Sequence, residues 1–282
     1  MFDAEAIRQI ANGDAIRAAN AHLACETTKS LIVPEDFKVV SYEHAMPLRN
    51  RARGNMKTSA TGDFVAYAVA SAEDGASIFI DPDSLRAVAV LNLGTPLAPG
   101  HADNTATLAL DQTAAYQSLL QHASGNPLSQ KSVAEFFEDW QDNMSFRDQD
   151  GNSITPAKAV AAIRKISIEA AKKVESEEQS LSATRSAFES VKATSTEAIP
   201  AHITFSCVPF YGLRDRTFAM RLSVLTGGAA PAFALRIIKF EQHRQEMSAE
   251  LVSDVEGRVA EIVEQESRGK LPVMIGTYTT GR

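Results

Sequence analysis

The sequence predicts an α+β fold: a mainly antiparallel sheet flanked by helices, with an N-terminal helical arm and a long C-terminal amphipathic helix. Three observations predict it. Short apolar and β-branched runs, separated by turn residues, occupy the middle and the last third of the 282-residue chain. Segments with helical spacing lie between these runs. Residues 246–266 carry an apolar stripe, which is typical of a helix packed against a core.

The N-terminal arm is predicted from residues 3–24, where apolar side chains recur at helical spacing. Asn12-Gly13-Asp14 interrupts them with a stop signal and a new N-cap, so we expect two short helices. We place the arm at residues 1–30 and a single α+β domain at residues 31–282. Within that domain, residues 33–40 are expected to be extended because they contain a proline and several β-branched residues.

The middle of the chain is expected to mix helices and strands. Residues 59–72 predict a helix behind a cluster of Ser, Thr and Asp caps. Three strands follow, of which the first two form a hairpin, at residues 77–80, 87–93 and 106–110. Asp111 or Thr113 caps the next expected helix. Ser129 caps another, whose apolar face consists of Val133, Phe136, Phe137, Trp140 and Met144.

The last part of the chain predicts a short helix from Pro156, then a strand at residues 164–169. Residues 180–194 are compatible with a helix or with a returning strand. An antiparallel meander follows, with strands at residues 203–209, 217–225 and 232–241. The helix at 246–266 and a strand at 273–277 complete the fold.

The C-terminal helix carries its stripe on five side chains: Leu251, Val255, Val259, Ile262 and Val263. Glutamates occupy other positions of the helix and keep them in water. Such a stripe must be buried, either on the preceding meander or on a neighbouring subunit. The helix is therefore a core element or an oligomer contact.

Composition and charge restrict the function classes. The net charge of −7 argues against a general electrostatic contact with nucleic acid or anionic membrane, so any such contact must be local. Cys25 and Cys207 lie far apart without a Cys-x-x-Cys motif, so we expect two buried thiols and neither a zinc site nor a disulfide framework. No signal sequence and no membrane-length apolar stretch is visible, which predicts a cytoplasmic protein without a membrane partner.

Several short segments, taken in their order along residues 45–265, resemble the YfdQ-like family, a group of uncharacterised phage and prophage proteins. They are Pro47–Gly54, Asp63–Tyr67, Ala89–Asn92, His101–Asp103, Val133–Asp139 and Val208–Leu213. The resemblance implies a viral origin and the cytoplasm of a bacterial host. It implies no known activity, cofactor or catalytic residue.

The candidate metal ligands are His101 and Asp103, because an imidazole and a carboxylate two residues apart can share a divalent ion. A loop that precedes a strand is the commoner explanation of this pattern. Glu135 and Glu138 line the acidic face of a predicted helix and are candidates to join such a site, although a solvated helix face is again the commoner arrangement. No cofactor and no small-molecule substrate is indicated by a recognised motif.

The densest basic cluster consists of Arg49, Arg51 and Arg53, whose guanidinium groups suit phosphate. Phe64 or Tyr67 then lies near enough in sequence to stack on a base, although their helical spacing favours core packing. The alternative for the arginines is a strip of salt bridges within or between subunits.

Two functions remain open. The first is a self-associating, non-enzymatic phage protein that forms a ring or shell or binds a host factor. The second is a nucleic-acid-binding accessory factor in phage replication or recombination. A metal-dependent hydrolase centred on His101 and Asp103 is a third and weaker hypothesis.

Overall fold

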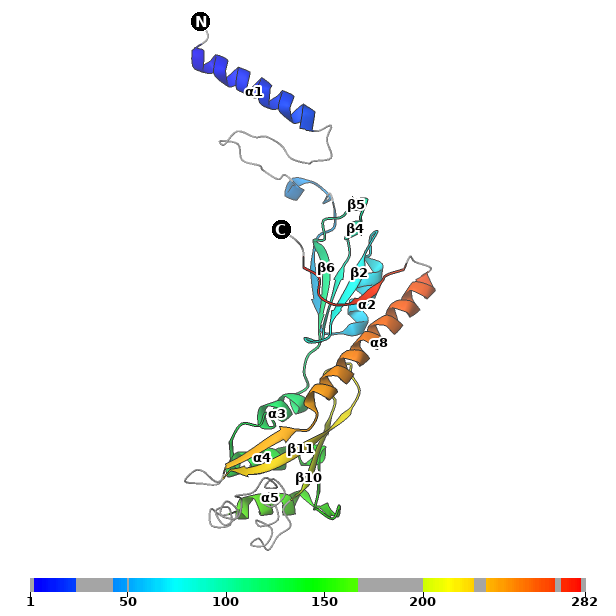
Figure 1. Cartoon of the computed structure of the whole chain (residues 1–282). Helices are drawn as coiled ribbons and strands as arrows, with labels where there is room; N and C mark the ends of the chain where they lie inside the picture. The colour runs from blue at the N-terminus through cyan, green and yellow to red at the C-terminus, as the bar shows by residue number, and fades with distance from the viewer. Residues whose placement is uncertain are drawn as a thin grey trace. The chain divides into compact units, whose positions relative to one another are not determined.

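A computed structural model describes residues 3–23, 43–49, 51–166, 200–225, 232–266 and 270–279. Contacts between Cα atoms divide the chain into two units, residues 1–52 and residues 53–282. The first unit contains helix α1 (Ala4–Leu23) and the 3₁₀ helix η1 (Glu43–Ala45), as Figure 1 shows. Because α1 is continuous, the expectation of two short helices was wrong. A glycine inside a helix costs only about 1 kcal/mol relative to alanine, and many alanines surround Gly13.

Several expectations fall outside the described residues. They concern the end of the arm at residue 30, the extended segment at 33–40, Cys25, and the helix or strand at 180–194. The strand expected at 164–169 lies partly there, but Arg164 and Lys165 belong to a helix, so its predicted start was wrong. The basic residues of that turn instead lie at a helix C-terminus, where the macrodipole favours them.

The described strands of the second unit form a five-stranded sheet, a six-stranded sheet and a two-stranded hairpin. The five-stranded sheet has the order β1-β6-β3-β2-β13, with bounds Gly54–Thr58, Asn104–Ala109, Arg86–Val90, Ser77–Asp81 and Val273–Ile275. The six-stranded sheet has the order β7-β12-β11-β10-β8-β9, with bounds Leu128–Ser129, Ala232–Ile237, Arg216–Leu225, His202–Cys207, Met144–Arg147 and Ser153–Ile154. The hairpin pairs β4 (Gly94–Thr95) with β5 (Ala98–Pro99).

Most strand pairs are antiparallel, which confirms the predicted fold class. The β2–β3 hairpin and the β10–β11–β12 meander are formed as expected. The exceptions are the parallel pairs β1–β6 and β13–β2. Parallel neighbours need long connections, and β13 reaches β2 only after the whole six-stranded sheet has been formed in between.

The described helices of the second unit begin in different ways, with side-chain caps at three of them but none at Ala60, the N-cap of the helix predicted at residues 59–72. They are α2 (Thr61–Ala70), α3 (Ala114–His122), α4 (Gln130–Asp139), η2 (Gln141–Asn143), α5 (Pro156–Lys165) and α8 (Phe240–Glu266). The side chain of Thr113 accepts a hydrogen bond from the Tyr116 N–H at 3.3 Å, and Ser129 accepts one from the Ser132 N–H at 3.1 Å. Of the two caps proposed for α3, Thr113 is therefore the correct one.

Helix α8 starts six residues earlier than the stripe predicts, so the third meander strand is shorter than expected. The strand ends at Ile237, and Lys239 adopts a φ of 55°, which turns the chain into the helix. The helical spacing of the buried residues Leu251, Val255 and Val259 also includes Met247, which lies in the first half of α8. The strand expected at residues 232–241 therefore included the first turn of this helix.

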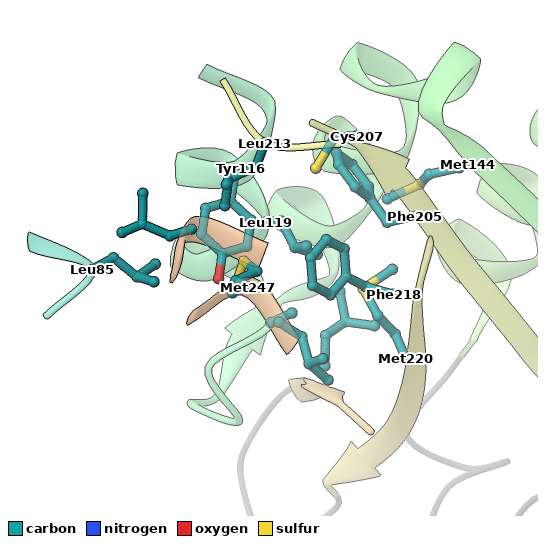
Figure 2. Close-up of a cluster of buried hydrophobic side chains, with 14 of the residues drawn as sticks. Leu85, Tyr116, Leu119, Met144, Phe205, Cys207, Leu213, Phe218, Met220 and Met247 are labelled. Carbon is teal, nitrogen blue, oxygen red and sulfur yellow. The ribbon is translucent and has the colours of Figure 1, made fainter. Parts of the chain in front are cut away.

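The stripe of α8 is buried within its own chain. Met247 joins Tyr116, Leu119 and Phe218 in the core beside the six-stranded sheet (Figure 2). Further along, Leu251, Val255 and Val259 are buried, and Ile262 and Val263 are half-buried against the same core. Helix α2 contacts α8 there. Of the two surfaces proposed for the stripe, the structure shows packing inside the subunit.

Candidate functional site

The two faces of the six-stranded sheet differ in their side chains. One face is apolar and contacts the helices: Phe205 of β10, Phe218 of β11 and Phe233 of β12 are fully buried. Along β11, buried side chains alternate with Thr217, Ala219 and Arg221 on the other face. This period of two is the pattern of a sheet with one covered and one open face.

The open face of this sheet carries hydroxyl groups, alanines and cations. None of the six strands contains an aspartate or a glutamate. The phenylalanine side chains of these strands all lie on the covered face. On a chain with 35 acidic and 28 basic residues, a large acid-free surface is unusual. The open face is therefore a local positive area on an acidic protein.

Strand register brings the basic side chains of this face into one row. Arg147 of β8 pairs with His202 of β10, and Arg221 of β11 pairs with Arg236 of β12. His202 and Arg221 are neighbours as well, because the adjacent pair is Ile203 with Met220. Directly opposed side chains lie about 5 Å apart, so the row crosses four strands in about 15 Å.

The row continues beyond β12 to Ser124, which forms an isolated bridge with Arg236. At this end an open pocket of about 660 Å³ is lined by Arg221, Arg236 and Lys239. Its remaining wall includes the apolar side chains of Leu120 and Phe240. The row of cations thus ends in a concave site with both charged and apolar walls.

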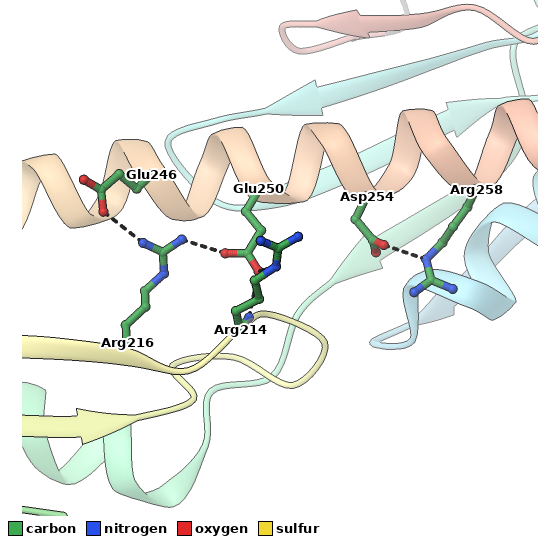
Figure 3. A network of polar contacts seen from close by, with 6 residues as sticks. All are labelled: Arg214, Arg216, Glu246, Glu250, Asp254 and Arg258. Carbon is green, nitrogen blue, oxygen red and sulfur yellow. Dashed lines mark hydrogen bonds and ion pairs between the residues drawn. The ribbon is translucent and has the colours of Figure 1, made fainter.

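Among the described residues, the arginines of the open face have no carboxylate partner, in contrast to the arginine on the opposite side of β11. Arg216 faces α8 and binds Glu246 at 3.0 Å and Glu250 at 2.6 Å, as Figure 3 shows. Within the described part of the chain, the guanidinium groups of Arg221 and Arg236 make no hydrogen bond or ion pair.

Arg147 belongs to the same uncompensated row. Its guanidinium donates to the Gly151 carbonyl at 3.1 Å, and it has no ion pair among the described residues. Two like charges directly opposed on neighbouring strands, as in Arg221 and Arg236, are destabilising. An anion between them removes this repulsion, so the row can bind an anionic ligand.

The predicted basic cluster is divided by the boundary between the two units. Arg49 and Arg51 belong to the first unit, whereas Arg53 belongs to the second and precedes β1 directly. Arg49 and Arg53 are exposed and Arg51 is half-exposed.

Asp103, one of the two predicted metal ligands, is hydrogen-bonded within the loop before β6. The Asp103 carboxylate accepts a hydrogen bond from the Asn92 amide at 2.9 Å, and the Asn92 side-chain oxygen accepts one from the Asn104 N–H at 3.0 Å. His101 is exposed at the surface of the same loop. Among the described residues, no group of three or more His, Cys, Asp and Glu side chains is arranged to hold a metal ion.

The acidic residues of α4 form separate surface ion pairs. Glu138 binds Arg164 of α5 at 2.8 Å, and Glu135 lies 3.6 Å from Lys131. These pairs leave the carboxylates on a solvated face, as the commoner explanation predicted. Phe64, one of the proposed stacking residues, is fully buried in the core, and Tyr67 is 37% exposed.

Sequence reasoning missed the row on the open face. Arg147, His202, Arg221 and Arg236 come from four strands and are far apart in sequence, so only the register reveals their alignment. The sequence does contain one signal: each residue occupies a polar position in an alternating strand that itself contains no acidic residue. Local charge density, which singled out Arg49 to Arg53, does not detect this pattern.

No helix among the described residues combines the length and the apolar character that a membrane crossing requires. A family model described as an uncharacterized conserved protein (DUF2303) matches residues 3–278 of the chain. Comparison with the curated proteins and with the solved structures gives no match. The function must therefore be inferred from the geometry of the chain itself.

Proposed function

Because the chain belongs to DUF2303, a family of uncharacterized conserved proteins, we propose its function from the open face and assign it nucleic-acid binding through the sugar-phosphate backbone. The observation that carries this proposal is the acid-free row of Arg147, His202, Arg221 and Arg236. Regularly spaced phosphates are the ligand that suits a row of cations on a flat surface.

The chemistry of the open face favours contacts that do not depend on base sequence. All four phenylalanines of the six strands, Phe146, Phe205, Phe218 and Phe233, are buried in the core. No phenylalanine ring of these strands is therefore available to stack on a base. The exposed hydroxyl group of Ser145 lies two residues from Arg147 on the same face of β8 and can donate a hydrogen bond to a phosphate oxygen.

The proposal is tested by fluorescence anisotropy with a single-stranded oligonucleotide whose ends are hydroxyl groups. Arg221→Gln combined with Arg236→Gln should weaken binding at low salt and lower the slope of log affinity against log salt by about 1.4, since each phosphate contact contributes about 0.7. Arg164→Gln is the matched control, because Arg164 is ion-paired with Glu138 away from the row. Absence of binding by the natural protein, or equal binding by the double variant, would refute the proposal.

The cluster of Arg49, Arg51 and Arg53 is a second proposed contact for the same ligand. Arg49 and Arg53 are exposed and Arg51 is half-exposed, and the three lie within five residues of the chain before β1. Arg51→Glu should then weaken the affinity in the same titration. An unchanged affinity would limit the interface to the six-stranded sheet.

We further propose a phage or prophage origin and the cytoplasm of the bacterial host as the setting. The segments that resemble the YfdQ-like family support this origin, and accessory proteins of phage replication act on nucleic acid in that compartment. Immunodetection of the native protein in fractionated infected or induced cells tests the location. Recovery from the envelope fraction would contradict it.

Self-association is the second candidate function, and helix α1 is the feature that favours it. Ile10 is 59% exposed on this helix, and most of the described α1 side chains are exposed. An exposed isoleucine on a helix with few described contacts suits pairing with a second copy. Ile10→Asp should reduce the mass measured by light scattering after size exclusion, whereas Asn12→Asp, which adds the same charge without removing an apolar group, should not. A monomeric natural protein would exclude this candidate.

A further inference from the structure

We infer that the pocket at the end of the cation row binds the terminal phosphate monoester of a nucleic-acid strand. This inference rests on the proposed function and adds a ligand class to it. The pocket is lined by Arg221, Arg236 and Lys239, which come from β11, from β12 and from the turn before α8. Three cations thus line one concave site of about 660 Å³, a size that suits a nucleotide.

The charge balance of the pocket favours a doubly charged anion. Glu241 is the carboxylate among the lining residues, and its oxygen binds the Arg244 guanidinium at 3.1 Å. Arg244 is held in place by a second bond to the Asp83 carbonyl at 2.9 Å. The three lining cations have no ion pair among the described residues. A terminal monoester carries nearly two negative charges at neutral pH, whereas an internal diester carries one.

The backbone conformation fixes the position of Lys239, the third cation that lines the pocket. Lys239 has a φ of 55°, a conformation that costs energy for a residue with a side chain. The Ile238 N–H donates to the Ala219 carbonyl at 2.8 Å, so β12 stays paired up to the residue before this turn. Helix α8 begins at the next residue. The lysine is therefore placed between the end of a paired strand and the start of a helix.

The walls of the pocket fit the remainder of a terminal nucleotide. Leu120 and Ala123 of the α3 end and Phe240 of α8 supply apolar surface, and Ser124 supplies a hydroxyl group. The row from Arg147 to Arg236 leads to this site across the sheet. A strand whose internal phosphates follow the row therefore places its last nucleotide in the pocket.

The test compares oligonucleotides of one sequence with a 5′-phosphate, a 3′-phosphate or hydroxyl groups at both ends. Fluorescence anisotropy should show at least about tenfold tighter binding for one of the phosphorylated ends, the weight of one charge-assisted hydrogen bond. Lys239→Gln should reduce this ratio to about one. Lys158→Gln, an exposed lysine of α5, is the charge-matched control and should keep the ratio.

The outcomes separate this inference from the proposed function. Equal binding of all three oligonucleotides refutes the terminal-phosphate site and leaves the backbone interface standing. A preference that persists in Lys239→Gln also refutes it, because the end is then recognised elsewhere. Competition by a free nucleoside monophosphate without any preference among the oligonucleotides assigns the pocket to free nucleotides and overturns the strand-end ligand. Absence of binding to every oligonucleotide refutes the proposed function itself.

Discussion

Arg216 and Glu250 form a nearly buried ion pair that connects β11 to α8. Their Nη2 and Oε2 atoms lie 2.6 Å apart, and their side chains are only 15% and 17% exposed. The Glu250 carboxylate also accepts a hydrogen bond from the Arg214 N–H at 2.7 Å. This pair, with Glu246 beside it, fixes the first half of α8 against the six-stranded sheet (Figure 3).

Removing one partner of this pair should be strongly destabilising. Arg216→Met removes the nearer and more buried of the two cations of Glu250, leaving only the exposed Arg214 at 3.8 Å, and is expected to lower the free energy of unfolding by about 3–5 kcal/mol. Arg164→Met is the control, because its pair with Glu138 is exposed and should contribute less than about 1 kcal/mol. Chemical denaturation measures both values. If the Arg216 variant loses no more stability than the control, the pair does not fix α8.

A carboxylate in the buried stripe of α8 should disrupt the second unit. Val259 is 5% exposed, and Val259→Asp adds an unpaired charge to the core while it removes an apolar contact. We expect loss of the cooperative thermal transition, measured by near-ultraviolet circular dichroism. Ala260→Asp places the same charge on the next, exposed residue and should melt nearly as the natural protein does. Similar melting of the two variants would mean that Val259 faces solvent.

The loop that joins β3 to β6 should not tolerate a side chain at Gly94. This glycine has a φ of 74°, and a Cβ there would overlap backbone atoms of Gly100 and Ala98. Gly94→Ala is expected to cost at least about 1–3 kcal/mol in chemical denaturation. Gly13→Ala is the opposite case, because nothing lies near that position and alanine favours the helix by about 0.5–1 kcal/mol. Far-ultraviolet circular dichroism should show unchanged or higher helicity for Gly13→Ala. If Gly94→Ala is as stable as the natural protein, the loop is not packed as described.

Stability should decrease in alkaline solution because of two buried acids. Burial raises the pKa of the Tyr116 hydroxyl from 10.0 to about 12, and burial likewise raises the pKa of the Cys207 thiol from 9.0 to about 12. Between these values the folded chain holds protons that the unfolded chain releases, so the free energy of unfolding decreases as the pH increases from about 9 to 12. Denaturation at several pH values should show this slope, and Tyr116→Phe should reduce it. An identical slope in the variant would assign the effect to other groups.

The sequence predicts elements that local signals specify and misses those that only pairing creates. The caps at Thr113 and Ser129, the β2–β3 hairpin and the meander of β10, β11 and β12 are visible as turn residues and alternation. The two-residue strands β4, β5, β7 and β9 have no pattern of their own, because two residues cannot show a period. Continuity of α1 through Gly13 was missed because a weak helix breaker was treated as a stop.

The residues of the candidate site likewise divide into those that a local sequence pattern reveals and those that only strand pairing brings together. Arg49, Arg51 and Arg53 were found because they are adjacent in sequence, but the boundary between the two units separates them. Arg221 and Arg236 were not found, because their proximity depends on the register of two strands that are 15 residues apart at this point. Strand register is set by the whole hydrophobic pattern and by turn geometry, which single positions do not reveal.

The connection of the two sheets has a consequence for synthesis on the ribosome. The six-stranded sheet is built from residues 128–237, all of which lie between β6 and β13 of the five-stranded sheet. All its described strands are synthesised before β13, so they can pair with one another while the chain is still growing. The five-stranded sheet is complete only when β13, residues 273–275, has left the exit tunnel and paired with β2. These two strands are nearly two hundred residues apart in the sequence. During that interval the outer edge of β2 has free backbone groups, which makes it the position where a nascent chain is most open to wrong partners and to chaperones.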